Sequence, residues 1–346
     1  MGSRIEEQEE LMDSAAMHKI LTLDLPEEGL KSAIVEKLST PLSPYRGDAE
    51  FEELWTYAKD VAKEFPDALK SAVASFRDRR TEHGALLLRG LPVDDAALGP
   101  TPGHWSTATG HSRETETYLL AVASLLGEVF SFERQHEGRL VQNMVPVEDD
   151  AYTQKGTGSK VFLEWHTEDA YDHLRADFIG ILCVRPDPSA KTAIAPAADV
   201  DVAPEHRKCL MEPRFHIGVD PASGGSGRPQ DGPVLPILVL EPNSGVRVRL
   251  DTDQVAPVAH DAEAAAALKS FHAAIPAAAS YVTLGRGELL VIDNHRTLHA
   301  RTAYEPRFDG TDRWLQRVSI TTDLARSASV RTRRPRVVDR EARFFH

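Results

Sequence analysis

Cysteine is scarce in this sequence, whose 346 residues include only Cys183 and Cys209. Two cysteines cannot build a disulfide framework, and the sequence has no Cys-x-x-Cys metal motif. Cys183 lies within the apolar run 178–184, so we expect it to be a buried free thiol. This use of cysteine fits a reducing, cytoplasmic compartment.

Long apolar runs and an excess of positive charge are also absent. Hydrophobic residues make up 41% of the sequence, which is enough for a sizeable core, but no run approaches the length needed to cross a bilayer. The net charge of -13 argues against nucleic acid or an anionic membrane as the main partner. We therefore expect neither partner, while the length leaves the number of domains and a homo-oligomeric state open.

The two ends of the sequence are polar. Residues 1–16 are acidic and lack the apolar segment of a secretory signal, so we interpret them as a vector-derived leader before a second start at Met17. The arginine-rich residues 328–346 are expected to form a solvated basic tail.

The N-terminal part has mainly helical patterns. Apolar residues recur at three- and four-residue spacing over 48–80, with a break at Pro66, and again over 112–130. Between them, the apolar run 85–91 predicts a buried strand.

From about residue 131 to 323 the chain is rich in strand patterns. One helix is expected at 259–274, and the Gly- and Pro-rich stretch 219–232 is either a disordered insertion or a functional lid. The expected strands are 140–145, 161–165, 178–184, 192–196, 237–240, 246–250, 280–284, 289–293 and 315–321. Many short strands with turn signals between them predict a mainly β fold with flanking helices, as an antiparallel sandwich or barrel.

The stretch His166-Thr167-Glu168 carries the first candidate chemistry. Alternate residues of an extended segment point to the same side, so His166 and Glu168 can face one metal ion. The triplet alone is weak, because 14 histidines and 53 acidic residues make chance matches common. His299 would complete a set of two imidazoles and one carboxylate, which leaves positions on iron open for substrate and oxygen.

His295 is a rival ligand, because it lies four residues before His299. Two ligands at that spacing suit a helix, whereas the preceding strand pattern argues against one here. We therefore expect His295 to support the site or to be exposed.

Arg313 and Arg317 differ by four positions on an expected strand, so they share one face. Two guanidinium groups on an inward face are costly unless each meets an anion. The pair forms either surface salt bridges or two sites for carboxylates, which a guanidinium binds through paired donors.

Together these motifs resemble the clavaminate-synthase-like Fe(II)/2-oxoglutarate oxygenases, and within them the hydroxylases of free L-amino acids from peptide-antibiotic pathways. The resemblance covers about residues 48–327. It is carried by Trp165-His166-Thr167-Glu168-Asp169-Ala170, by Arg175-Ala176-Asp177-Phe178 and by the segment 293–317.

The resemblance implies a distorted double-stranded β-helix, or jelly roll, as a single domain over residues 17–327. Its helical part would span about 48–130 and its jelly-roll core about 131–323. Residues 219–232 would be a lid that closes over the substrate and excludes water.

The resemblance also implies how the cofactors are held. His166, Glu168 and His299 would bind Fe(II), while Arg313, helped by Thr192, would hold the distal carboxylate of 2-oxoglutarate. Oxygen activation would then release succinate and carbon dioxide and hydroxylate the substrate.

For the substrate, the resemblance implies that Arg317 binds the α-carboxylate and Gln135 the α-amino group beside Glu168. Asp251 and Asp253 are either an exposed acidic turn or ligands for a cationic side chain, because a second Asp accompanies basic substrates in this family. A charge-assisted hydrogen bond contributes about 1.5–3 kcal/mol to such binding.

We therefore expect hydroxylation of L-arginine at C3, with C4 hydroxylation or desaturation as variants. L-Lysine, L-citrulline and other polar amino acids are alternatives, because the segment 152–159 looks more like the lysine and asparagine enzymes than the arginine enzymes. Glu168 argues against halogenation, which needs that ligand position free. Two other classes stay open: a zinc hydrolase with the same triad, and a non-catalytic jelly-roll binding protein.

Overall fold

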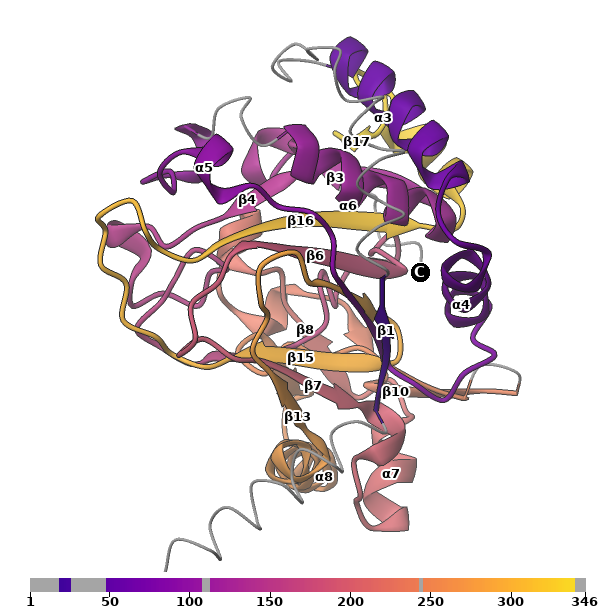
Figure 1. The fold of residues 1–346 in the computed structure, drawn as a ribbon. Coiled ribbons are helices and arrows are strands. Elements are labelled where there is room, and N and C mark those ends of the chain that lie inside the picture. The colour runs from indigo at the N-terminus through magenta and orange to yellow at the C-terminus, as the bar shows by residue number, and fades with distance from the viewer. Residues whose placement is uncertain (1–18, 26–47, 108–112, 243–244, 340–346) are drawn as a thin grey trace, which may run out of the picture.

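Two β-sheets face each other, and helices cover their outer sides (Figure 1). The computed structural model describes residues 19–25, 48–107, 113–242 and 245–339. The larger sheet has the strand order β1-β2-β14-β6-β16-β3-β17, with β4 also paired to β16, and the smaller has the order β13-β7-β15-β5. Two further small sheets, β12-β8-β9 and β10-β11, lie outside them.

The described α-helices are α3 (Asp48–Lys63), α4 (Asp67–Arg77), α5 (Asp95–Leu98), α6 (Arg113–Leu126), α7 (Pro204–Leu210) and α8 (Ala262–Ala274). The strands of the larger sheet are β1 (Ile20–Asp24), β2 (Ala85–Arg89), β3 (Glu128–Phe132), β4 (Gln142–Met144), β6 (Phe178–Arg185), β14 (Leu289–Asp293), β16 (Trp314–Thr321) and β17 (Val337–Val338). The smaller sheet comprises β5 (Leu163–His166), β7 (Thr192–Pro196), β13 (Ser280–Val282) and β15 (Thr297–Arg301). The remaining strands are β8 (Phe215–Ile217), β9 (Val234–Leu235), β10 (Leu238–Glu241), β11 (Gly245–Val248) and β12 (Val255–Pro257).

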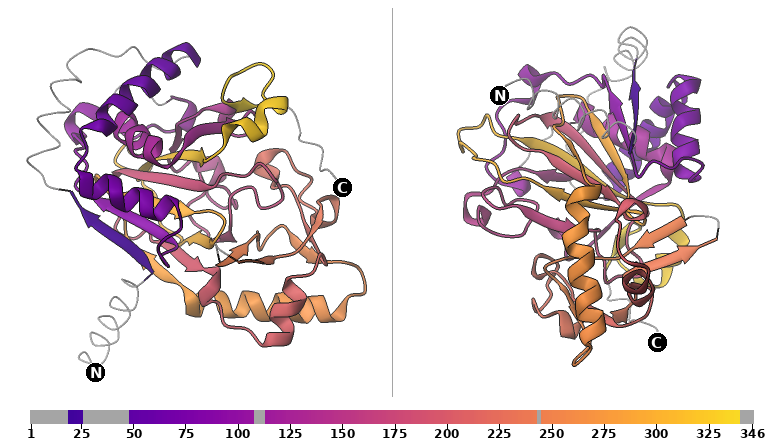
Figure 2. Two further views of the ribbon diagram at one scale, coloured as in Figure 1. Left: turned by 90° about the vertical axis from the view of Figure 1, so that its right-hand side faces the viewer. Right: turned by 90° about the horizontal axis from the view of Figure 1, so that it is seen from below.

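The apolar run of β14 shows how the layers form. Leu289 and Val291 pack with α3, α4 and α6, whereas Leu290 and Ile292 face the core between the sheets. Because successive side chains of a strand point to opposite faces, a strand buried on both faces has a continuous run of apolar residues in its sequence. On the other side of the molecule, α7 and α8 pack on the outer face of β7 and β15 (Figure 2).

The strands expected between residues 140 and 321 are all present, with ends that differ by up to two residues. The helix expected over 112–130 is wrong at its end, because α6 stops at Leu126 and β3 begins at Glu128. Gly127 lies between them, and a Cβ added there would be 2.3 Å from the carbonyl oxygen of Thr321 on β16. This close approach of two backbones divides the helix from the strand.

The C-terminal arm, residues 328–339, was expected to be solvated, and this expectation is wrong for residues 336–338. Val337 and Val338 are buried in β17, which pairs in parallel with β3. Arg336 is also buried, and it donates hydrogen bonds to Glu52 and Glu128. An arginine-rich segment can dock when partner carboxylates lie on neighbouring elements, which the local sequence does not reveal.

Residues 1–16 lie outside the described residues, so their interpretation as a leader stays a prediction. Within the described part of the chain, no helix combines the length and apolar character needed to cross a membrane.

Arg336→Met should lower the free energy of unfolding by about 1–3 kcal/mol, because it leaves two partly buried carboxylates without their partner. Chemical denaturation followed by circular dichroism would measure this change. Arg333→Met is the control, because its ion pair with Glu133 lies at the surface and should contribute little. Equal stability of the two variants would contradict a docked arm.

Candidate active site

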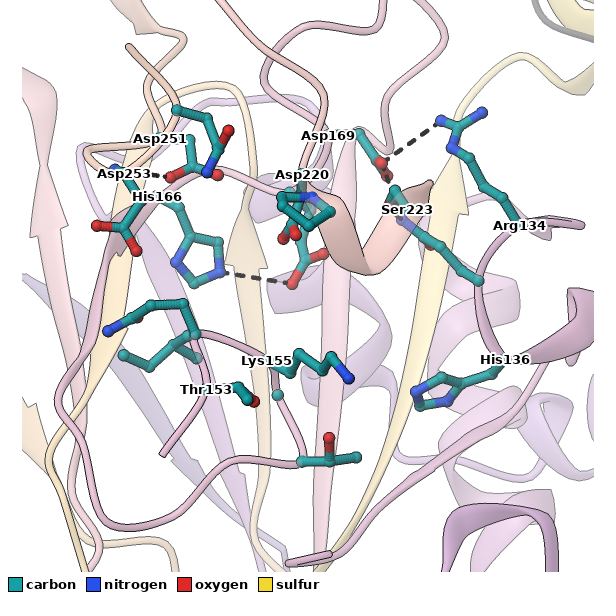
Figure 3. Close-up of a pocket in the computed structure, with 18 of the residues that line it drawn as sticks. Arg134, His136, Thr153, Lys155, His166, Asp169, Asp220, Ser223, Asp251 and Asp253 are labelled. Atoms are coloured by element: carbon teal, nitrogen blue, oxygen red, sulfur yellow. Dashed lines mark hydrogen bonds and ion pairs between the residues drawn. The ribbon is translucent and has the colours of Figure 1, made fainter. Parts of the chain in front are cut away.

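A pocket with a volume of about 840 Å³ lies next to β5 and β16. Six of the residues that line it were predicted from the sequence: Gln135, His166, Glu168, Asp251, Asp253 and Arg317. Figure 3 shows Asp251 and Asp253 beside His166, with Asp169, Ser223 and Arg134 on the other side of the pocket. Asp220, Pro221 and Ser223 of the expected lid also line the pocket.

The pairing of β5 with β15 brings the two candidate histidines together. The strands are antiparallel, and His166 lies directly opposite His299. Their ring centres are 4.2 Å apart. His299 occupies the middle of β15, where the polar residues Thr297, His299 and Arg301 alternate with Leu298 and Ala300.

Glu168 completes the cluster two residues after β5 ends at His166. Its Oε1 lies 3.7 Å from Nε2 of His166 and 3.6 Å from Nε2 of His299. Ligands about 2.1 Å from one ion lie about 3–3.5 Å apart, so these three atoms need only a small movement to share a metal. Among the described residues, this is the cluster of His, Cys, Asp and Glu side chains that could hold a metal ion.

The tautomer of His166 suits metal binding. Its Nδ1 lies 2.7 Å from the carbonyl oxygen of Glu164, which can only accept a hydrogen bond. In the neutral ring the proton is therefore on Nδ1, which leaves the Nε2 lone pair facing Glu168 and His299. Two imidazoles and one carboxylate are the donor set that iron(II) oxygenases use, so the residues present fit iron.

Charges in this cluster are strongly coupled. Burial opposes the negative charge of Glu168, but Arg317 and the two histidines outweigh it and hold its pKa well below the usual range. Burial likewise opposes a charged His166, yet the hydrogen bond and charge of Glu168 raise its pKa to about 9. Burial and the neighbouring His166 lower the pKa of His299 to about 4. The site without metal therefore keeps Glu168 ionised.

Asn294 holds the main chain of Glu168 from the turn between β14 and β15. The N–H of Glu168 donates to Oδ1 of Asn294 at 2.8 Å, and Nδ2 of Asn294 donates to the carbonyl oxygen of Glu168 at 3.1 Å. The same amide group donates to the carbonyl oxygen of Ala176. The turn that leads into β15 and His299 therefore also positions Glu168.

His295 is buried and does not join the metal cluster, which resolves the alternative left open by the sequence in favour of a supporting role. Its Nδ1 accepts hydrogen bonds from Arg175 and Arg247, so its proton lies on Nε2, which donates to Asp177 at 2.8 Å. Burial lowers the pKa of His295 to about 4, so the ring is neutral beside these two cations. This network holds the turn before β15 in place.

Arg317 projects from β16 toward Glu168. Its Nη1 lies 2.5 Å from Oε1 of Glu168, and its Nε and Nη2 donate to Oε1 of Gln142. Gln142 on β4 lies directly opposite Arg317 in the sheet and holds the guanidinium from behind. Sequence reasoning missed Gln142, because only the strand pairing brings it next to Arg317.

Gln135 lies on the same side of the pocket as Asp169. Its Nε2 donates to Oδ1 of Asp169 at 2.8 Å and to the hydroxyl of Ser223 at 3.3 Å. The amide oxygen of Gln135 is then oriented to accept a hydrogen bond. Ser223 belongs to the expected lid, so this contact joins the lid segment to the pocket wall.

The acidic side of the pocket contains more carboxylates than the sequence analysis found. Burial and the nearby charges of Asp220 and Asp253 raise the pKa of Asp251 to about 6, against the opposite effect of His166. Burial and Asp253 also raise the pKa of Glu164. Glu164 lies two positions before His166, so strand alternation could have placed it on the same face.

Arg313 and Thr192 lie apart from the residues that line the pocket. Arg313 is buried immediately before β16, and the strand expected to hold both arginines begins one residue later, at Trp314. Its guanidinium carbon is 5.8 Å from the ring centre of Tyr304. Thr192 begins β7 and pairs with Arg301 on β15, whose guanidinium carbon is 5.2 Å from the same ring.

Comparison with known proteins places this site in a family. Residues 223–319 match the family described as taurine catabolism dioxygenase TauD, TfdA family. Over 337 residues the chain is 32% identical to enduracididine beta-hydroxylase of Streptomyces hygroscopicus, covering 90% of this chain and 97% of that protein. It is 36% identical over 315 residues to L-asparagine oxygenase of Streptomyces coelicolor, covering 90% of this chain and 92% of that protein.

The chain belongs to the Fe(II)/2-oxoglutarate-dependent oxygenases of free amino acids. A solved structure agrees: the non-heme iron oxygenase OrfP in complex with Fe, succinate and (3S)-hydroxy-L-Arg superposes with a TM-score of 0.81 at 27% identity, over 92% of this chain and 99% of OrfP.

Membership of this oxygenase family confirms three of the predictions. The fold is a jelly roll, the protein is an enzyme, and its cofactor and cosubstrates are Fe(II), 2-oxoglutarate and O2. The zinc hydrolase and the non-catalytic binding protein are thereby excluded. In the described residues the strands form the two facing sheets of the fold without closing into a continuous barrel.

Asn294→Ala should weaken Fe(II) binding by about 10–100-fold, because groups that orient metal ligands typically contribute this much to affinity. Anaerobic Fe(II) titration would measure the dissociation constant. Asn143→Ala is the matched control, because Asn143 is equally buried but accepts its hydrogen bond from Trp314 instead. Unchanged iron affinity in the folded Asn294→Ala protein would contradict this role.

Proposed function

We propose that this oxygenase hydroxylates free L-arginine at C3, with iron held by His166, Glu168 and His299. The observation that supports arginine as the substrate is the arrangement of charged side chains in the pocket. One cation, Arg317, projects next to Glu168, while Asp220, Asp251 and Asp253 gather on the side of His166. This pattern is complementary to an amino acid with a free carboxylate and a cationic side chain.

The carboxylates favour a cationic ligand for a physical reason. Burial is the main cause of the raised pKa of Asp251, and repulsion by the carboxylates of Asp220 and Asp253 adds to it. A guanidinium group placed between Asp251 and Asp253 would relieve this repulsion and use its fork of donors. Lys155 also lines the pocket, but its ammonium group is paired with Asp150 at 2.6 Å and so does not offset the carboxylates.

The predicted anchors place the α-carbon next to the iron ligands. Arg317 would bind the substrate carboxylate through Nη1, which becomes available when Glu168 turns its Oε1 to the metal. Gln135 would accept a hydrogen bond from the α-ammonium group, beside Glu168. With both groups of the α-carbon held, the adjacent C3 is the carbon presented to the metal, which supports C3 hydroxylation over C4.

Arg313 and Thr192 would hold the distal carboxylate of 2-oxoglutarate. Iron(II) and 2-oxoglutarate supply the activation of oxygen when bound, with succinate and carbon dioxide as co-products. The protein's own contribution is placement and protection: the lid segment 219–232 contacts Gln135 through Ser223 and would exclude water once substrate is present. A cytoplasmic location and a homo-oligomeric state stay predictions.

The decisive experiment supplies the purified protein with Fe(II), 2-oxoglutarate and oxygen, together with a panel of free amino acids. We expect L-arginine to give the fastest succinate release and a product that has gained one oxygen atom in mass spectrometry. Arginine deuterated at C3 should lose deuterium in that product. Turnover of asparagine with no turnover of any basic amino acid would refute the assignment to basic substrates.

Asp253→Asn should raise KM for L-arginine by roughly 10-fold or more, because it replaces a charged acceptor of the guanidinium group. KM for a neutral substrate such as L-citrulline should change little, so the ratio of the two kcat/KM values is the measurement. Asp309→Asn is the control, because its carboxylate accepts hydrogen bonds from Thr311 at the surface, outside the pocket. An equal loss on both substrates would argue against a role for Asp253 in recognising charge.

A cyclic guanidino amino acid is the second candidate. The relative from Streptomyces hygroscopicus is named for enduracididine and aligns over nearly its whole length. Including enduracididine in the panel separates the two candidates, because the true substrate should have the higher kcat/KM.

A further inference from the structure

Arg301 is a buried cation whose donors are only partly used. It lies on β15, two residues after His299, and is 5% exposed. Its Nη1 donates to the carbonyl oxygens of Ser159 and Thr302, both at 3.1 Å. Its Nε and Nη2 are buried and have no hydrogen-bond partner among the described residues. A buried guanidinium with two unused donors is costly unless an anion binds there.

A second buried guanidinium, that of Arg313, lies in the same region. Both groups approach the ring of Tyr304, with guanidinium carbons 5.2 and 5.8 Å from its centre. Within the described part of the chain, neither Arg301 nor Arg313 forms an ion pair with a carboxylate. Two neighbouring guanidiniums without a counter-charge favour the binding of an anion near them.

The register of β15 aims Arg301 toward the interior between the sheets. Against β7 the pairing is regular, with His299 opposite Ile194 and Arg301 opposite Thr192. Ile194 belongs to the core between the two sheets, so alternate residues on these strands share that inner face. Arg301 therefore points into the same interior as His299, about 7 Å farther along the strand. This separation is about the length of a five-carbon keto diacid.

We propose that Arg301 is a second guanidinium for the distal carboxylate of 2-oxoglutarate, acting together with Arg313 and Thr192. The inference rests on the proposed iron and 2-oxoglutarate sites and adds a residue to them. Its consequence is selectivity: two cations would favour a keto acid with a second carboxylate over one that ends in a methyl group. The Nη1 edge of Arg301 meanwhile holds the end of the segment 152–159 through Ser159.

The test compares two keto acids that differ only at the distal end, 2-oxoglutarate and 2-oxopentanoate. Each is titrated anaerobically into the Fe(II)-loaded protein, and binding is followed by the visible charge-transfer absorption of the iron–keto acid complex. Arg301→Met should raise Kd for 2-oxoglutarate by about tenfold or more and leave Kd for 2-oxopentanoate unchanged. An equal effect on both keto acids, or no effect on either, would overturn the proposal.

Two further variants keep the result interpretable. Arg301→Lys keeps the charge but loses the fork of donors, so it should give a smaller loss, again for 2-oxoglutarate alone; this variant carries the test if Arg301→Met does not fold. Arg336→Met removes an equally buried arginine from the C-terminal arm and should bind both keto acids like the unaltered protein. If the unaltered protein fails to bind 2-oxoglutarate, the proposed cofactor sites are contradicted. If it binds 2-oxoglutarate but both Arg301 variants keep its preference for 2-oxoglutarate over 2-oxopentanoate, only the role of Arg301 is contradicted.

Discussion

The antiparallel pairing of β5 with β15 is the constraint on which the site depends, because it places His166 opposite His299. Glu168 follows β5 directly, and Asn294 holds its main chain from the turn that begins β15. One strand pair and one turn therefore position three side chains that lie up to 133 residues apart in the sequence. A register shift of one residue would turn either histidine to the opposite face.

The interior between the two sheets is divided by polarity. Around Ile194, Leu290 and Ile292 it is an apolar core, whereas toward β5 it contains ionised groups. Burying Glu168 is possible because Arg317 and two imidazoles surround it, and Gln142 in turn holds Arg317. The charge of each buried group is thus balanced by a neighbouring group, and a bound ion or cosubstrate would take over part of these interactions.

A feature could be predicted from the sequence when the residues that determine it are close together in the chain. The double-sided burial of β14 and the break at Pro66 are local patterns, so their elements were predicted correctly. Predicting the triad of His166, Glu168 and His299 required the spacing of its motifs and a family resemblance, because no local pattern connects His166 with His299. The docked C-terminal arm and Gln142 depend on partners more than a hundred residues away, so the arginine-rich tail was misread and Gln142 was overlooked.

The structure separates the chemistry of this enzyme from its choice of substrate. The proposed iron ligands and the two guanidiniums near Tyr304 belong to β5 and β15, or to residues next to β5 and β16, which pack in the sheets. The residues expected to recognise the substrate's side chain lie on loops between these strands instead. They are Asp220 on the lid segment, Asp251 and Asp253 after β11, and the segment 152–159. Loops tolerate substitution better than packed strands. Changes in these loops can therefore alter the amino acid that is recognised while the oxygen-activating centre stays intact.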